Sequence, residues 1–272
     1  MAAHDKAFFD AWFTTKAPQQ PLGFVIRPPE TDALYFSAGD QLTFELILFG
    51  SANEVRDDFF ASIWQWGALG LGPKRAPFKV VSIDAVLPGI TQPIFLAGMP
   101  PLEEPPIASV GEWLDHDLHQ LNWTPNSERV CLNVRALTRI VLKQENGKLL
   151  EAPSLDTFVS AIERRLQLLI RWYFDDDKQL FELIRQARPN LPESHLISSV
   201  QFSEWMRPQK STGQDLPFGG LLGQWSYVGH VQAAIPWLIL GKLLHVGSKS
   251  SFGLGQYDFS FAALAESYQM TG

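Results

Sequence analysis

Apolar and polar residues follow different periods along the second half of the chain, and their order predicts a set of helices and strands. Residues 156–174 repeat apolar side chains at the three- and four-residue spacing of a helix, and Ser154 is positioned to cap its start. Other segments follow on either side: strands over 129–144, 197–208, 220–232 and 252–261, and helices over 178–187 and 235–245. Without the short helix 178–187, the order is β-α-β-β-α-β.

This order is that of a ferredoxin-like (RRM-like) unit, in which four antiparallel strands carry two helices on one face. The first half is a degenerate version of the same pattern: a strand that ends at Gly50, an amphipathic helix over 54–69, and a second strand over 78–87. We therefore expect an α+β protein of two tandem ferredoxin-like modules. Their expected bounds are 1–126, including an acidic, proline-rich insertion at about 88–126, and 127–272, which carries a glycine-rich loop before the last strand.

Composition supports a folded chain. Apolar residues make up 46% of the 272 residues and charged residues 19%, which excludes a disordered chain. No apolar run reaches the roughly 20 residues that cross a bilayer, and the N-terminus does not have the pattern of a secretory signal, so we expect a cytoplasmic protein without membrane contact. The single cysteine, Cys131, excludes an intrachain disulfide and a cysteine-rich zinc site.

The net charge of −7 argues against a nucleic-acid partner until its distribution is considered. Residues 101–128 hold six acidic side chains and no Lys or Arg, so this segment accounts for most of the excess. Residues 196–255 hold four Lys or Arg against two acidic residues, which leaves room for a local basic surface: Arg207, Lys210, Lys242 and Lys249. The acidic segment is an alternative docking site for a partner protein.

The most distinctive local feature is HVGSKSSFGLGQY, residues 245–257, here called the glycine loop. Gly247, Gly253 and Gly255 permit positive φ and let backbone amides converge on an anion, and Lys249 adds a positive charge. The spacing matches neither the phosphate loop of nucleotide hydrolases nor the dinucleotide fingerprint. Two interpretations stay open: a phosphate-binding loop, or a helix C-cap at Gly247 followed by a glycine-rich turn.

Proton-transfer candidates lie close to this loop in the sequence. His230 follows Tyr227 at the end of a predicted strand, and His245 ends the helix before the loop. His245 also has a structural interpretation, because a cation is favoured at a helix C-terminus. His116 and His119 have the spacing of metal ligands, but their acidic surroundings indicate a solvated helix face.

Signatures of serine hydrolases, zinc hydrolases and cysteine nucleophiles do not occur in the sequence. Among the nine tryptophans, those in predicted helices are expected in the core, whereas Trp205 and Trp225 lie on predicted strands. These two are the better candidates for stacking on unpaired bases.

The glycine loop with its following strand, HVGSKSSFGLGQYDF, resembles the C-terminal signature of the CRISPR-associated endoribonucleases that process precursor crRNA, members of the RAMP superfamily. Segments of the first half, FVIRPPE, AGDQLTFELILFGSA and DDFFASIWQWGALGLGPKRAPFKVVSI, are similar to the N-terminal half of that family and occur in the same order. The resemblance covers about residues 22–87 and 218–260.

The resemblance implies a nuclease that needs no metal or cofactor, binds the repeat RNA of a CRISPR transcript, and has further CRISPR effector proteins as possible partners. A ribose 2′-hydroxyl would attack the adjacent phosphate, leaving a 2′,3′-cyclic phosphate. The family's N-terminal histidine has no counterpart here, since no histidine lies between His4 and His116. The expected catalytic residues are therefore His230, His245, Tyr227 and Lys249.

The resemblance also assigns RNA contacts to the glycine loop and to nearby basic residues: Gly247, Ser248, Lys249, Ser250, Gly253, Gly255, Lys74, Arg75, Arg207, Lys210 and Lys242. The missing N-terminal histidine keeps an alternative open, in which the chain is a non-catalytic RNA-binding RAMP subunit of a CRISPR interference complex.

Overall fold

Residue contacts divide the chain into two units. The computed structural model describes residues 20–29, 31, 33, 35–72, 74–99, 104–124, 128–144, 146–209 and 214–264. Within these ranges, unit 1 spans residues 51–124, and unit 2 combines residues 20–50 with residues 128–264. The division near residue 125 lies close to the boundary expected at 126, but the segment before Ser51 groups with the C-terminal part of the chain.

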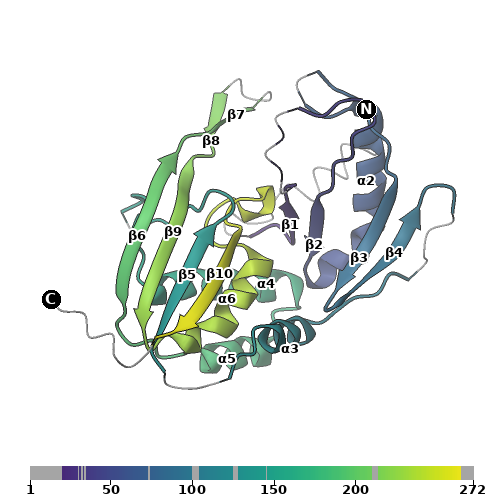
Figure 1. The fold of residues 1–272 in the computed structure, drawn as a ribbon. Helices are drawn as coiled ribbons and strands as arrows, with labels where there is room; N and C mark the ends of the chain where they lie inside the picture. The colour runs from purple at the N-terminus through teal and green to yellow at the C-terminus, as the bar shows by residue number, and fades with distance from the viewer. Residues whose placement is uncertain are drawn as a thin grey trace. The chain divides into compact units, whose positions relative to one another are not determined.

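A four-stranded antiparallel sheet forms the centre of unit 2 (Figure 1). Its strands follow the spatial order β10-β5-β9-β6, with these bounds: β5 Val130–Ala136, β6 His195–Ser203, β9 Gly220–Gly229 and β10 Tyr257–Ala263. Of the four strands of this sheet, the first and third in chain order, β5 and β9, are central, and the second and fourth, β6 and β10, are at the edges. With the helices between them, this arrangement confirms the predicted ferredoxin-like order.

Two helices, α4 (Leu155–Tyr173) and α6 (Ile235–Leu244), cover one face of this sheet (Figure 1). As predicted, Ser154 caps α4, since its side chain accepts a hydrogen bond from the Thr157 amide over 3.1 Å. The buried stripe of α4 packs between α6 and aromatic side chains of the sheet: Phe158 lies edge-on to Tyr257 at 5.2 Å between ring centroids. The core of unit 2 therefore lies between these helices and the sheet.

The opposite face of the sheet carries polar side chains. Ser226 donates a hydrogen bond to the Asn133 side chain over 2.6 Å, and Gln224 donates to the same oxygen over 3.1 Å. Because neighbouring residues on a strand point to opposite faces, these side chains alternate with the buried Trp225 and Tyr227.

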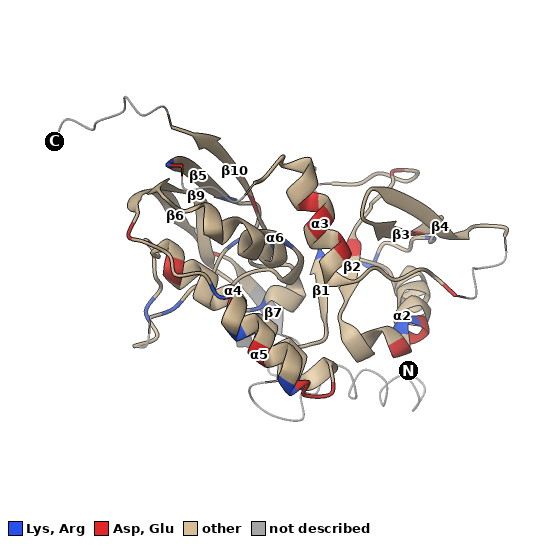
Figure 2. Ribbon diagram, turned by 90° about the horizontal axis from the view of Figure 1, so that it is seen from below, with Lys and Arg blue, Asp and Glu red and all other residues tan. Residues whose placement is uncertain are grey.

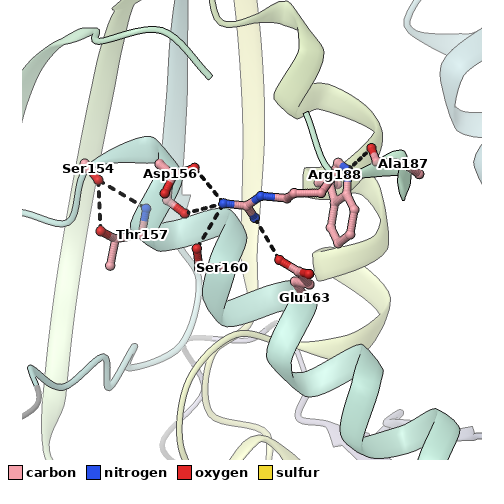
Figure 3. A network of polar contacts seen from close by, with 8 residues as sticks. Ser154, Asp156, Thr157, Ser160, Glu163, Ala187 and Arg188 are labelled. Carbon is pink, nitrogen blue, oxygen red and sulfur yellow. Dashed lines mark hydrogen bonds and ion pairs between the residues drawn. The ribbon is translucent and has the colours of Figure 1, made fainter. Parts of the chain in front are cut away.

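Arg188 fixes the short helix α5 (Lys178–Ala187) to α4. Figure 3 shows its guanidinium beside α4, where it donates to the Asp156 carboxylate over 2.6 Å and to Ser160 over 2.9 Å. A second nitrogen lies 3.4 Å from Glu163. Several contacts to one planar group orient the end of α5 more firmly than an isolated surface ion pair would.

Two short hairpins complete unit 2. Strands β1 (Phe24–Arg27) and β2 (Glu45–Leu48) pair with each other, and β7 (Met206–Gln209) pairs with β8 (Gln214–Pro217). Arg27 joins the first hairpin to α6, because it donates to the Lys242 carbonyl oxygen over 2.8 Å.

Unit 1 contains α2 (Arg56–Leu69), a hairpin of β3 (Ser82–Leu87) and β4 (Ile90–Leu96), and α3 (Val110–Gln120). The helix predicted over 54–69 is present as α2 and ends before Gly70 as expected. The strand predicted over 78–87 is present as β3. The segment expected as an acidic, proline-rich insertion at about 88–126 holds a strand, β4, and a helix, α3. Pro93 in β4 obscured the strand pattern, since proline is tolerated only at edges and bulges, and the pairing shifts at this point.

The strands of the first half form two separate antiparallel pairs, β1–β2 and β3–β4. The described helices include none that is long and apolar enough to span a membrane.

The buried stripe of α4 predicts how strongly its residues contribute to stability. Ile162 of α4 is fully buried beside Gly241 of α6, whereas Leu183 on α5 is 62% exposed. We expect Ile162→Ala to lower the free energy of unfolding by about 2–5 kcal/mol, because it leaves a cavity in the core. The matched Leu183→Ala should change it by less than about 0.5 kcal/mol. Urea unfolding monitored by circular dichroism measures both, and equal losses would contradict this packing.

Candidate nucleic-acid interface

The glycine loop connects α6 to β10 and runs across the segment that follows β5. Ser248 donates its amide to the Val141 carbonyl oxygen over 3.1 Å, and Gly255 donates to the Arg139 carbonyl oxygen over 2.9 Å. Thr138 contributes a side chain, whose hydroxyl donates to the Gly253 carbonyl oxygen over 2.7 Å. The loop is therefore fastened by backbone contacts.

Two of its glycines are required by these close contacts. Gly247 has φ of +85°, and a Cβ atom there would lie 2.5 Å from the Val141 carbonyl oxygen. Gly255 has φ of +83°, and its Cβ would overlap the Val246 carbonyl oxygen. Any larger residue would be strained and would collide with backbone. The glycines thus have a packing reason that does not depend on a bound anion.

Many loop amides already donate hydrogen bonds to groups of the protein. The amides of Phe252 and Gly253 form turns within the loop, and the Gln256 amide donates to the Thr138 hydroxyl over 2.9 Å. Ser250 is buried, and only Ser248 is exposed among the serines predicted to contact RNA. A phosphate at this loop would therefore be held by side chains and by the remaining amides, and not by a ring of all its N–H groups.

Lys249 is the loop side chain best placed to meet an anion. Its backbone is left-handed, with φ of +63°, and its ammonium donates to the Pro217 carbonyl oxygen and lies 4.3 Å from the centre of the Phe218 ring. Partial burial and the nearby charge of Lys143 lower the pKa of Lys249. The exposed Lys143 thus lies close enough to Lys249 for the two charges to interact.

His245 lies beneath the loop. Its ring is completely buried, Nδ1 is 3.0 Å from the Leu254 carbonyl oxygen, and Nε2 has no hydrogen-bond partner among the described residues. Burial, reinforced by the positive charges of Arg27 and Arg165, lowers the pKa of His245 to about 3. The imidazole is neutral at pH 7, so it is not a helix-capping cation, and in this conformation it is closed to solvent.

Tyr227 and His230 differ in their surroundings. Tyr227 is buried in the sheet and donates a hydrogen bond to the Pro153 carbonyl oxygen over 3.0 Å, and burial raises its pKa. His230 is exposed after the end of β9. Because Lys249 contacts Pro217 near the start of β9, the length of that strand separates His230 from Lys249 by roughly 30 Å. The structure does not bring these four candidates to one point.

The remaining basic candidates belong to several different elements. Lys242 forms an ion pair with Asp258 over 2.9 Å, and its ammonium lies over the Phe259 ring, 5.8 Å from its centre. Lys74 and Arg75 are exposed in unit 1, Arg207 lies on β7, and Lys210 is outside the described residues. Acidic residues gather along α3, also in unit 1 (Figure 2). Trp225, predicted to stack on bases, is instead fully buried and donates to the Glu151 carbonyl oxygen over 2.8 Å, so that expectation is wrong.

Sequence reasoning missed two cations beside the loop, Arg139 and Lys143. Arg139 donates to the Ser203 carbonyl oxygen over 3.3 Å and lies over the Trp205 ring, 5.3 Å from its centre. Both residues belong to the continuation of β5, where a strand-like run gives no indication of which positions face the loop. Only the pairing of this run with Gly247 and Leu221 places them.

Comparison with known proteins gives the loop a family context. Residues 134–257 match the family model of the CRISPR-associated endoribonuclease Cas6, a segment that begins within β5 and ends at the first residue of β10. The matched segment contains the whole glycine loop. Residues 4–107 match a second family, AF_1859_N, described as an N-terminal domain. No curated protein sequence matches the chain.

Solved structures share the fold over most of this chain. The partial Cas6-RT-Cas1–Cas2 complex and the Cas6-RT-Cas1–Cas2 complex each match at 16% identity and a TM-score of 0.52, over 95% of this chain. The match covers 42% and 26% of those longer chains, respectively, so this chain spans less than half of their length. Cas6 of Thermus thermophilus in its product complex matches at 13% identity and a TM-score of 0.51, over 94% of this chain and 86% of the other. The segment that matches the Cas6 model thus lies within a fold similar to that of these solved structures.

The burial of His245 predicts how stability depends on pH. Its folded pKa of about 3 is below the ordinary value of 6.5, so the unfolded chain takes up a proton first as pH falls. The stability that the neutral, buried His245 contributes is fully present above about pH 6.5. It is lost as pH falls towards 3, at roughly 1 kcal/mol per pH unit. His245→Asn, which carries no group that titrates in this range, should remove this contribution. Urea unfolding of both proteins from pH 7 to 4 measures the difference, and parallel pH profiles would contradict a neutral, buried His245.

Proposed function

We propose that this chain is a Cas6-type endoribonuclease, which binds the repeat RNA of a CRISPR transcript and cleaves it to release crRNA. The observation that carries the proposal is the Cas6 family match over residues 134–257, which includes the glycine loop. The fold agrees with it, because the ferredoxin-like sheet and the loop occur together. Association with further CRISPR proteins is part of the same proposal.

The reaction we propose needs no metal. The ribose 2′-hydroxyl attacks the adjacent phosphate, the 5′-oxygen leaves, and the products are a 2′,3′-cyclic phosphate and a 5′-hydroxyl end. Negative charge grows on the phosphate oxygens in the transition state, so a fixed cation lowers the barrier. We assign this role to Lys249, because it is the predicted catalytic side chain at the loop that is partly open to solvent.

A second candidate function is RNA binding without cleavage. It is favoured by the positions of the predicted proton-transfer groups: His245 and Tyr227 are buried, and His230 is at the far end of β9 from the loop. General acid–base catalysis requires a group within hydrogen-bond reach of the transferred proton. In this alternative, the same loop and lysines hold the repeat RNA for other proteins to process.

Cleavage in the presence of a chelator separates the two functions. The purified protein is incubated with EDTA and a labelled CRISPR repeat RNA from its own genome. We expect one cut per repeat and a 2′,3′-cyclic phosphate end. No cut should occur when a 2′-deoxy nucleotide precedes the scissile phosphate, because the nucleophile is then missing. Tight binding of the intact RNA without any cut would reject the enzyme and select the binding function.

Variants of Lys249 and His230 locate the reaction. Lys249→Ala should lower the single-turnover cleavage rate by about 10²–10³-fold, because the charge at the phosphate is lost, and Lys249→Arg should recover part of it. His230→Ala is the matched control and should cleave within about twofold of the wild-type rate, since it lies far from Lys249. A rate loss confined to His230→Ala would instead locate the reaction at the opposite end of β9.

A further inference from the structure

Three aromatic rings form a row beside the glycine loop. Trp205, which lies between β6 and β7, meets Phe218 edge-on at 5.2 Å between ring centroids, and Phe218 meets Phe252 of the loop at 5.6 Å. Phe218 is 2% exposed, whereas Trp205 is 43% exposed and Phe252 45%. We call these three residues the aromatic shelf: a buried central ring supports an exposed ring on each side.

Backbone contacts hold the shelf in place. The Phe218 amide donates to the Trp205 carbonyl oxygen over 2.7 Å, and the Phe252 amide donates to the Lys249 carbonyl oxygen over 3.0 Å. The exposed rings therefore sit on fixed backbone. Their exposure leaves apolar surface in water, which a partner with flat, apolar faces would cover favourably.

Cations accompany both parts of the shelf. The Lys249 ammonium lies 4.3 Å from the centre of the Phe218 ring, and the Arg139 guanidinium lies 5.3 Å from the centre of the Trp205 ring. Lys143 is close enough to lower the pKa of Lys249. Within the part of the chain that the structure describes, these three side chains form no ion pair with a carboxylate, although the exposed Glu204 precedes Trp205.

Exposed rings next to cations without carboxylate partners are what a single-stranded nucleic acid requires. The bases stack on aromatic faces whatever their identity, and the phosphates between them need positive charge. We propose that Trp205 and Phe252 each stack on one unpaired base of the bound RNA, while Lys249 and Arg139 contact the intervening backbone. This inference rests on the proposed function and adds to it a subsite for unpaired nucleotides.

The test measures binding of a fluorescein-labelled CRISPR repeat RNA from the same genome by fluorescence anisotropy, between 50 and about 300 mM salt. Trp205→Ala and Phe252→Ala should each weaken binding about 5- to 100-fold, since stacking of one base is lost. The slope of log Kd against log salt should not change, because stacking releases no counterions. Lys249→Ala should instead reduce that slope by about one.

Two controls separate stacking from folding. Trp205→Phe keeps a ring at the site and should bind within about threefold of wild type. Tyr35→Ala removes an aromatic side chain that is 89% exposed elsewhere in unit 2, and it should bind like wild type. An abasic nucleotide at the stacked position should weaken binding to the wild type but have no further effect on Trp205→Ala.

The outcomes are distinguishable. If Lys249→Ala weakens binding but Trp205→Ala and Phe252→Ala do not, the shelf is refuted and the proposed function stands. If the wild-type protein neither binds nor cleaves the repeat RNA, the proposed function fails, and the shelf fails with it. If the aromatic variants bind RNA normally but lose binding to another CRISPR protein, the shelf is a protein-docking surface, and our assignment of RNA bases to it is wrong.

Discussion

The arrangement of unit 2 around the glycine loop depends on one close approach of backbone to backbone. Gly247 passes so near the Val141 carbonyl oxygen that a Cβ atom would be only 2.5 Å from it, and the Ser248 amide donates to the same oxygen. This contact holds the loop against the continuation of β5. With the loop in this position, His245 lies buried beneath it, and Lys249 lies beside Phe218 where a ligand can reach it.

Two partly buried cations complete this arrangement at the end of α6. Arg27 donates to the Lys242 carbonyl oxygen, and Arg165 donates to the Leu244 carbonyl oxygen. Helix C-termini leave carbonyl groups without partners and carry partial negative charge, so guanidinium groups are well suited to them. The same two positive charges disfavour protonation of His245. The helix end is thus stabilised by arginines, and the histidine remains a neutral part of the core.

The length of β9 determines which of the candidate side chains can act together in one functional site. Phe218, at the start of this strand, belongs to the aromatic shelf and lies beside Lys249, whereas His230 follows the other end. A strand of ten residues has one end about 30 Å from the other, so side chains at its two ends cannot act on the same phosphate. The cations and aromatic rings beside the loop can therefore contact RNA, but His230 lies too far from them to transfer a proton at the same phosphate.

The sequence by itself determined the local elements of unit 2, including the Ser154 cap, the stripe of α4 and the strand order along the chain, because period and capping are properties of neighbouring residues. It also indicated the glycine loop, since closely spaced glycines favour a backbone with positive φ. Only the tertiary structure decided that Trp225 and His245 are buried while Trp205 and Phe252 are exposed beside Lys249 and Arg139. Those outcomes depend on which strand face meets α4 and on contacts between residues far apart in sequence; a one-residue change of register in β9 would turn Trp225 to the opposite face of the sheet.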